Sequence, residues 1–506
     1  MTENKSAPLV VLGLDGGDPD LLVQWAREGY LPTLASVMKR GCWAKTGGPE
    51  LITEHGPWLQ LFSGISRGQL GYYYLRQLRS GTYDLHLATG HGLDAPPFWA
   101  ALRGTQRKVA TFDVPEVYPI SGVPGIQLAN WAVHQGWTSS DPADAPRTEP
   151  AALIEEVRQL YGPRLSIYEN SDSNLDEDQR IFSRLLEQVS RSGELYRDLL
   201  RRDRFDVVAA VFAASHTGGH QFWKYRNQPD GQELGHAIRD IYAAIDHEMG
   251  LLLADELAGA NVIIVSSVGM KDHFPMGGLL EDFCRKLGYQ VASQSWPSLM
   301  GLARSLVPER WRVAVSRHFS RETRERLLAE QFRAGTDWSK TTAFAIPSSY
   351  TGFLRVNLSG REPQGIVQPG AEHADVLRRL ENDLHQLTDP DSGEPVVQQV
   401  VRTSDLFGSD AHPALPDLFV IWKPQPHFRR RLRHPAGEIA QKRPEWCRGS
   451  DHSQSGFLAA AGPAIHACGC IEVVSLMDIA PTLLTLLKAP VPEAMHGKVQ
   501  RVMVEA

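Results

Sequence analysis

The stretch PLVVLGLDGGDP, from Pro8 to Pro19, decides the fold. Its first seven residues form an apolar run rich in Val and Leu, which is typical of a strand buried on both faces of a parallel sheet. The run ends in the acidic loop DGGD, and Asp18 followed by proline is typical of a helix start. A strand, an acidic loop and a helix in this order predict the first unit of a doubly wound α/β fold.

The same alternation of strand and helix recurs along the chain. Further apolar runs predict strands, and the amphipathic stretches between them predict helices. The predicted strands are Lys108–Val114, Asp206–Ala214, Asn261–Ser267, Asp417–Trp422 and Gly456–Ala461, and the predicted helices span about 176–202 and Ala237–Ala258. We therefore expect an α/β fold with a doubly wound, mostly parallel sheet, helices on both faces, and ligands bound at the carboxyl ends of the strands.

Two segments break this alternation, and we interpret them as insertions into a single domain that spans residues 1–506. Residues 120–175 are rich in Gly, Pro, Asp and Ser, and residues 290–345 carry several Arg and Trp. Long irregular segments of compact enzymes are often lids. We expect both insertions to pack over the carboxyl ends of the strands, with Trp131 facing the site. Decoration of the surface is the alternative.

Composition argues against several classes of protein. The chain has 52 Lys and Arg against 59 Asp and Glu, a net charge of −7, which argues against a dedicated nucleic-acid binder. No apolar run reaches the roughly 18 residues that a membrane-spanning helix needs. The five cysteines form no CxxC pair, so neither a disulfide framework nor a cysteine zinc site is indicated. With no signal-peptide pattern at the start, we expect a cytoplasmic protein.

Histidines and one carboxylate lie next to the predicted strands. Asp15 follows the first strand, His216 and His220 follow the strand that ends at Ala214, and His452 precedes a later one. A spacing of four residues places two side chains on one face of a helix. Because the strand ends meet at one edge of the sheet, these four side chains form a set of the type that holds Zn²⁺ or a similar transition metal.

A candidate nucleophile lies in the segment ITEHGPW, residues 52–58. Thr53 precedes Gly-Pro-Trp, which is typical of a helix start, so its hydroxyl would lie near free N–H groups and a partial positive charge. This environment favours an alkoxide or a bound phosphate, and a metal would lower the pKa of the hydroxyl further. The alternative is that Thr53 only caps the helix.

Together these motifs resemble the type I phosphodiesterase/nucleotide pyrophosphatase branch of the alkaline phosphatase superfamily. The segments that carry the resemblance are GLDGGDP, ITEHGPWLQLFSGISRGQLG, AASHTGGHQFW, DHSQSGFLAAAGPAI and VVSLMDIAPTLLTLLKAPVPEAMHGKV. The resemblance implies that Thr53 is the nucleophile and that Asp15, His216, His220 and His452 are metal ligands. His216 stands where the family has Asp, a substitution that can still ligate.

The chain departs from the family pattern at the second metal site. Ser267 and Val268 stand where the family has an Asp–His pair, and neither residue can replace that pair. The second site would keep Asp15 and Thr53 alone. The residues that remain as replacements are Asp272, His273, His55 and His134.

The resemblance implies a metal-dependent hydrolase that acts on a small phosphate ester or phosphodiester through a covalent phospho-threonine. It also implies a divalent metal, zinc, present as one or two ions. A transferase that passes the phosphoryl group to an alcohol is an alternative, and so is a redirected member that keeps the fold to bind a ligand. The register of the nucleophile is a further departure, because Thr53 lies five residues before Trp58 where the family spacing is four, a position held by Glu54.

Overall fold

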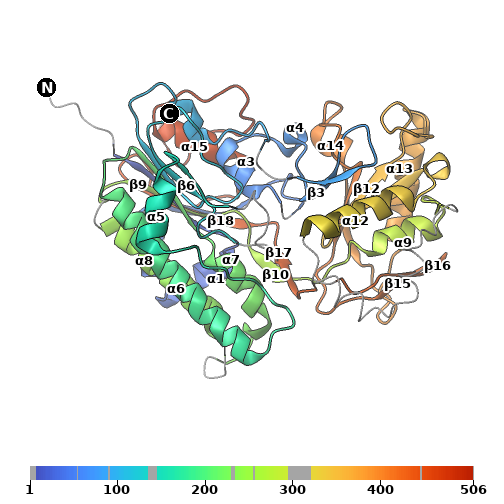
Figure 1. Ribbon diagram of the computed structural model, residues 1–506, viewed down its shortest axis with the longest axis horizontal. Helices are drawn as coiled ribbons and strands as arrows, with labels where there is room; N and C mark the ends of the chain where they lie inside the picture. The colour runs from blue at the N-terminus through green and yellow to red at the C-terminus, as the bar shows by residue number, and fades with distance from the viewer. Residues whose placement is uncertain are drawn as a thin grey trace.

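The computed structural model describes residues 7–53, 55–88, 92–134, 145–229, 234–254, 257–293, 321–444 and 447–504. Figure 1 shows two parts that lie side by side: a larger lobe built around a central sheet, and a smaller lobe that carries α9, α12 and α13. The smaller lobe is inserted between two strands of the central sheet, so the chain leaves the larger lobe and returns to it.

The central sheet of the described residues has ten strands and is mostly parallel. Its order is β19 (Gly469–Cys470), β2 (Cys42–Gly47), β18 (Gly456–Ala461), β9 (Asn261–Ser266), β1 (Leu9–Leu14), β8 (Val207–Phe212), β5 (Val109–Phe112), β6 (Gly125–Ala129) and β7 (Arg147–Glu149), with β20 (Val474–Ser475) beside β2. The strands from β9 to β6 are all parallel, whereas β18 and β7 run antiparallel to their neighbours. The expected doubly wound α/β fold is confirmed.

Helices cover both faces of the sheet, and the side chains of β1 show how. Val10, Leu12 and Leu14 pack in one apolar core, and Leu9 and Val11 pack in the other. On the first face lie α1 (Pro19–Glu28), α2 (Pro32–Arg40), α5 (Leu153–Tyr161), α6 (Leu175–Leu200), α7 (Ala214–Phe222) and α8 (Ala237–Ala254); on the second lie α3 (Pro57–Ser63), the 3-10 helices Phe98–Leu102 and Leu476–Asp478, and α15 (Ile479–Leu486). A strand buried on both faces is what the continuous apolar run predicted.

The smaller lobe has its own antiparallel sheet and its own apolar core. The sheet consists of β11 (Ala343–Ile346), β12 (Gly352–Val356), β14 (Leu418–Trp422) and β13 (Val397–Arg402); around it lie α9 (Leu279–Lys286), α12 (Arg321–Ala334), α13 (Ala371–His385), α14 (Thr403–Phe407), β15 (Arg431–His434), β16 (Gly437–Ala440) and the 3-10 turn Trp338–Lys340. The strand predicted at 417–422 therefore exists but belongs to this second sheet. An apolar run predicts burial and carries no information on which strands it pairs with.

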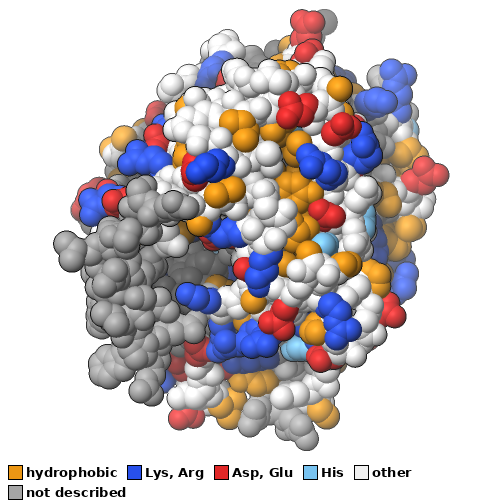
Figure 2. All heavy atoms as spheres, turned by 90° about the vertical axis from the view of Figure 1, so that its right-hand side faces the viewer, with side chains coloured by type: hydrophobic (Ala, Val, Ile, Leu, Met, Phe, Trp, Pro, Cys, Tyr) orange, Lys and Arg blue, Asp and Glu red, His pale blue; other side chains and the backbone are white. Residues whose placement is uncertain are grey.

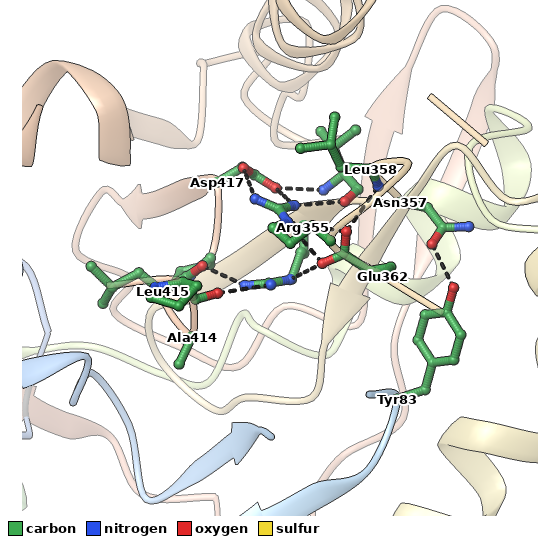
Figure 3. Close-up of polar contacts among 12 residues, drawn as sticks. Tyr83, Arg355, Asn357, Leu358, Glu362, Ala414, Leu415 and Asp417 are labelled. Atoms are coloured by element: carbon green, nitrogen blue, oxygen red, sulfur yellow. Dashed lines mark hydrogen bonds and ion pairs between the residues drawn. The ribbon is translucent and has the colours of Figure 1, made fainter. Parts of the chain in front are cut away.

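A buried ion-pair network holds the smaller lobe together (Figure 3). Arg355 Nε donates to Glu362 Oε1 at 2.6 Å, and both side chains are buried. Arg361 Nη2 donates to Asp417 Oδ2 at 2.7 Å, and this pairing holds the pKa of Asp417 below its usual value although burial alone would raise it. Each charge is compensated, as a buried charge requires.

Tyr83 connects the segment that follows the candidate nucleophile to the smaller lobe through a hydrogen bond and a ring contact (Figure 3). Its ring stacks on Trp338 at 3.7 Å, and its hydroxyl donates to Asn357 Oδ1 at 2.6 Å. Tyr83 lies in the turn between β3 (Arg76–Leu78) and β4 (Leu85–Leu87), which comes shortly after α4 (Arg67–Leu70). The smaller lobe therefore helps to position the chain around residues 53–78.

Parts of the two expected insertions are built into the fold itself. From the first, β6 and β7 join the central sheet and α5 covers one face of it. Trp131 packs in the apolar core, so the expectation that it faces the site is wrong; a large aromatic ring gains more from burial in the core. From the second, residues 294–320 lie outside the described residues, and α12 packs against β4.

The face of the smaller lobe carries basic and acidic side chains interspersed with each other (Figure 2). The run Arg429–Arg431 follows this pattern, because Arg429 pairs with Asp389 and Arg431 with Glu438. Interspersed charges are typical of a solvated surface. Among the helices described, none combines the length and the apolar character needed to cross a membrane.

Candidate metal centre and nucleophile segment

Three histidines come together at the carboxyl edge of the central sheet. His216 and His220 lie on α7, directly after β8. His452 lies on β17 (Ser450–His452), which pairs with β10 (Met270–Asp272) shortly after β9. The ring centroids are 4.6–4.9 Å apart and the ring planes are inclined by 62–76°. Inclined rings allow the in-plane lone pairs of three imidazoles to point at one central position.

Each of these imidazoles is held through its Nδ1 atom. His216 Nδ1 lies 2.9 Å from Asp15 Oδ2, His220 Nδ1 lies 3.0 Å from the hydroxyl of Ser450, and His452 Nδ1 lies 3.2 Å from the carbonyl oxygen of Gly269. A hydrogen-bond acceptor at Nδ1 fixes the tautomer and leaves Nε2 as the ligand atom. All three Nε2 atoms are thereby assigned to the centre of the cluster.

The spacing inside the cluster fits a divalent metal. The Nε2 atoms of His220 and His452 are 3.4 Å apart. Two nitrogens bound tetrahedrally to Zn²⁺ at 2.0–2.1 Å would be about 3.3–3.4 Å apart. Burial lowers the pKa of His216, of His220 and of His452, so the rings are neutral, as metal ligands must be. The residues present therefore fit a three-ligand metal site with an open fourth position.

Asp15 lies beside this cluster with both carboxylate oxygens engaged. Oδ2 contacts His216, and Oδ1 accepts a hydrogen bond of 2.7 Å from the indole Nε1–H of Trp58. Burial raises the pKa of Asp15, and the bond from Trp58 opposes this shift. Gly13 makes room for the indole, because a Cβ atom there would lie 2.8 Å from the Trp58 ring.

At the segment that the resemblance assigns to a second metal site, Ser267 and Val268, the described residues hold no cluster of potential metal ligands. Val268 is buried in an apolar core, and the Ser267 hydroxyl is buried beside it. Asp272 is turned away: it accepts a hydrogen bond from Trp223 and pairs with Arg226 at 2.5 Å.

The two remaining histidines near this position have aromatic neighbours. His273 packs at 5.8 Å from the ring of Tyr350, and burial lowers its pKa to about 4. His55 lies against the rings of Tyr72 and Tyr74 at 6.4 and 5.1 Å. Neither of these histidines belongs to a cluster of potential metal ligands in the described residues.

The candidate nucleophile lies in the loop before α3. Thr53 is buried, and its hydroxyl donates to the carbonyl oxygen of Tyr73 at 2.8 Å. Gly56, with φ of +87°, occupies the N-cap position of α3, so Thr53 does not cap this helix. The Tyr73 ring in turn packs against Phe353 and Phe419 of the smaller lobe. Glu54 lies outside the described residues.

Glu116 is a carboxyl group beside this loop that the sequence analysis did not single out. Its Oε1 accepts a hydrogen bond of 3.0 Å from the Gly56 N–H, and burial raises its pKa to about 7. Its backbone has φ of +62°, a strained value for a residue with a side chain. A perturbed carboxyl on a strained backbone after a central strand is typical of a functional site.

His134 and Glu169 form a second group beside His216. His134 stacks flat on His216, with ring centroids 4.0 Å apart and planes 11° apart, and its Nε2 lies 3.5 Å from Glu169 Oε1. The three residues are close enough together to be considered as metal ligands. Two stacked imidazoles, however, direct their in-plane lone pairs along parallel lines. This group therefore does not converge on an ion as the three-histidine cluster does.

Comparisons with known proteins agree with the site geometry on the kind of protein. The chain matches the family described as type I phosphodiesterase / nucleotide pyrophosphatase over residues 9–453. A comparison with curated proteins gives no match.

Three solved structures are similar to the chain at low sequence identity. Murine ectonucleotide pyrophosphatase / phosphodiesterase 5 is 13% identical, with 98% of this chain and 100% of that chain covered and a TM-score of 0.46. The human protein is 12% identical, with 98% and 99% covered and a TM-score of 0.48. An inactive form of the murine protein in complex with AMP is 12% identical, with 96% of each chain covered and a TM-score of 0.45.

The family match covers nearly the whole chain and includes Asp15, the nucleophile segment, α7 and His452. The chain therefore belongs to the type I phosphodiesterase/nucleotide pyrophosphatase family and is a phosphodiesterase-type hydrolase.

Proposed function

We propose that the protein hydrolyses a phosphate ester or phosphodiester with one divalent cation, zinc, held by His216, His220 and His452. The observation that carries this proposal is the convergence of three neutral imidazoles whose Nδ1 atoms are all engaged elsewhere. When bound, the cation supplies Lewis-acid stabilisation of the charge that develops on the phosphoryl and leaving oxygens.

Thr53 is the proposed nucleophile. Its Oγ1 forms a bond to phosphorus as the ester bond to the leaving alcohol breaks, which gives a covalent phospho-threonine; water then cleaves that bond and restores the hydroxyl. In the structure the Thr53 hydroxyl proton is donated to the Tyr73 carbonyl, which leaves the lone pairs of Oγ1 available for attack. The Tyr73 ring packs against Phe353 of the smaller lobe, which holds this carbonyl in place.

Asp15 acts by orienting rather than by ligating in this proposal. Its Oδ2 holds the Nδ1 of His216, and its Oδ1 holds the indole of Trp58 on the nucleophile helix. A carboxylate that binds the far nitrogen of a metal-ligating histidine fixes the ring and raises its basicity. Asp15 thus links the metal centre to the nucleophile segment.

A substrate panel tests the proposal. Purified protein is assayed on p-nitrophenyl phosphate, bis(p-nitrophenyl) phosphate and the p-nitrophenyl ester of a nucleoside monophosphate. Each assay is repeated after chelation and after Zn²⁺ is restored. We expect turnover of at least one ester, its loss on chelation and its recovery with Zn²⁺.

The other readings predict different results. A transferase releases p-nitrophenol faster when an alcohol is added and yields the alcohol phosphate. A redirected binding member retains zinc but turns over none of the esters. Either result would replace hydrolysis as the proposed function.

A further inference from the structure

Arg67 is a buried cation in the segment that follows the candidate nucleophile, and the proposed chemistry has not used it. The residue is 1% exposed and begins α4, shortly after α3. A guanidinium keeps its charge when it is buried, so its burial is costly unless its N–H groups are well paired. The acceptors that pair these N–H groups therefore indicate what Arg67 holds in place.

The guanidinium joins three parts of the chain around the nucleophile loop. Nη1 donates to the carbonyl oxygen of Tyr72 at 2.7 Å, Nη2 donates to Gln60 Oε1 at 3.3 Å, and Nε donates to the carbonyl oxygen of Glu50 at 3.3 Å. These acceptors belong to the chain before Thr53, to α3 after it, and to the segment that accepts its hydroxyl. Both sides of the loop and that segment are thereby tied to one planar group.

The same guanidinium packs against Gly56 within the loop. A Cβ atom at Gly56 would lie 3.3 Å from Arg67 Nη1, so the backbone approaches the guanidinium closely at this point. The Gly56 N–H donates to Glu116 Oε1 at 3.0 Å. The loop backbone is therefore held by both Arg67 and Glu116 shortly after Thr53.

The peptide group between Tyr72 and Tyr73 is held at both of its polar ends. Its oxygen accepts the hydrogen bond from Arg67, and its N–H donates to Gln77 Oε1 at 3.0 Å. Gln77 is buried, and its Nε2 donates to the carbonyl oxygen of Gly71 at 2.8 Å. The next carbonyl oxygen along the chain is that of Tyr73, which accepts the Thr53 hydroxyl at 2.8 Å. The orientation of this peptide group therefore determines where the Thr53 hydroxyl is held.

We propose that Arg67 is a positioning residue for the reaction, and that it holds the Thr53 hydroxyl in place through the peptide group between Tyr72 and Tyr73. In the proposed function, on which this rests, Thr53 Oγ1 attacks phosphorus. An attacking oxygen has to be placed accurately, and a misplacement of about 1 Å costs about 10²-fold in rate. Arg67 thus acts on the chemical step through Thr53.

The test is Arg67→Lys, which keeps the charge but replaces the planar fork by a single ammonium group that cannot reach all three acceptors. We expect kcat to fall by about 10²-fold, with KM and zinc content unchanged. The initial burst of p-nitrophenol, which reports formation of the adduct on Thr53, should slow by the same factor. A merely structural role would lower the thermal midpoint of unfolding and leave kcat of the folded protein unchanged.

Gln77→Met is the second variant, because it removes the acceptor at the other end of the same peptide group. It should also lower kcat at unchanged KM. Arg40→Lys is the matched control, since Arg40 is exposed on α2 and donates to Ser36 one turn away.

Wild-type kcat in folded Arg67→Lys would overturn the proposal, and so would a rise in KM alone or a loss of zinc. If Arg67→Lys does not fold, wild-type kcat in Gln77→Met would overturn it. A wild-type protein that hydrolyses no ester would instead refute the proposed function, which keeps the two failures distinguishable.

Discussion

The two halves of the centre differ in what their polar atoms are paired with. In the three-histidine half, every Nδ1 has a protein partner and every Nε2 is left for an ion. In the other half, both oxygens of Asp15 are paired with protein groups, and Val268 is packed in apolar core. The first half fits the proposed metal, whereas in the second half Asp15 is paired with protein groups and the buried Ser267 hydroxyl has no hydrogen-bond partner in the described residues.

The contacts of Asp15 show how a buried carboxylate stays ordered in the second half. A carboxylate left without its metal would be a buried, unpaired charge, which is costly. The indole N–H of Trp58 meets one oxygen of Asp15 and the imidazole of His216 meets the other. In the proposed function Asp15 therefore supports the neighbouring ligand His216.

The largest expected effect comes from Thr53→Ala, which removes the proposed nucleophile beside the three-histidine half. Removal of a nucleophile lowers turnover by about 10⁴-fold or more, and no adduct should form on incubation with ester. Zinc content and the thermal midpoint of unfolding should stay close to wild type. Near-wild-type turnover would show that Thr53 is not the nucleophile, and Glu54 and His55 would be tested next.

A smaller effect is expected from Asp15→Asn, which sharpens the supporting role of Asp15. Loss of a carboxylate behind a metal-ligating histidine weakens metal binding by about 10–100-fold, measurable by competition with a chromogenic chelator. Asp20→Asn is the control, because Asp20 is exposed on α1. If Asp15→Asn leaves zinc affinity unchanged, Asp15 does not support His216.

The smallest effect, on stability, is expected from Glu116→Gln, which removes the carboxyl group beside the nucleophile loop that the charge of Asp15 reaches. The folded pKa of Glu116 is about 7, above the usual 4.5, because of burial. At a pH between these two values the Glu116 carboxyl is protonated in the folded state and ionised in the unfolded state. The contribution of Glu116 to the free energy of unfolding therefore falls as the pH rises from about 4.5 to 7. The loss is at most about 3 kcal/mol.

The free energy of unfolding of Glu116→Gln relative to wild type should therefore be more favourable at pH 8 than at pH 5. Denaturant unfolding of both proteins at both pH values measures this difference. The control Glu187→Gln, which changes an exposed carboxyl on α6 that pairs with Arg191 one turn away, should show no such trend. A cation in the second half would lower the pKa of Glu116, so an identical pH dependence in wild type and Glu116→Gln would indicate a charge there that the structure does not include.

Much of the fold and the three-histidine half of the centre could be predicted from local sequence. Strands β1, β5, β8, β9 and β18 were anticipated within two residues, because continuous apolar runs report burial on both faces. Asp15, His216, His220 and His452 lie together as expected, since each follows or precedes a strand of one sheet. The second sheet was missed, because pairing between distant strands leaves no local pattern.

The rest of the centre depends on contacts across long sequence separations. Trp58 reaches Asp15 from 43 residues away, and Arg448 reaches Glu169 from 279. Glu169 follows no strand and lies in no motif, so nothing in its neighbourhood marks it. Gly13 is a local hint of close packing at this point of β1, because a Cβ atom there would lie 2.8 Å from the Trp58 ring and 2.8 Å from Val211.

The metal content of the purified protein tests the central claim most directly. Elemental analysis after dialysis should find one zinc per chain, none in His220→Ala, and still one in Asp272→Ala, whose side chain pairs with Arg226 instead of the centre. Two metals per chain in the wild type, with one of them lost in Asp272→Ala, would contradict the account, because the second half would then hold an ion after all.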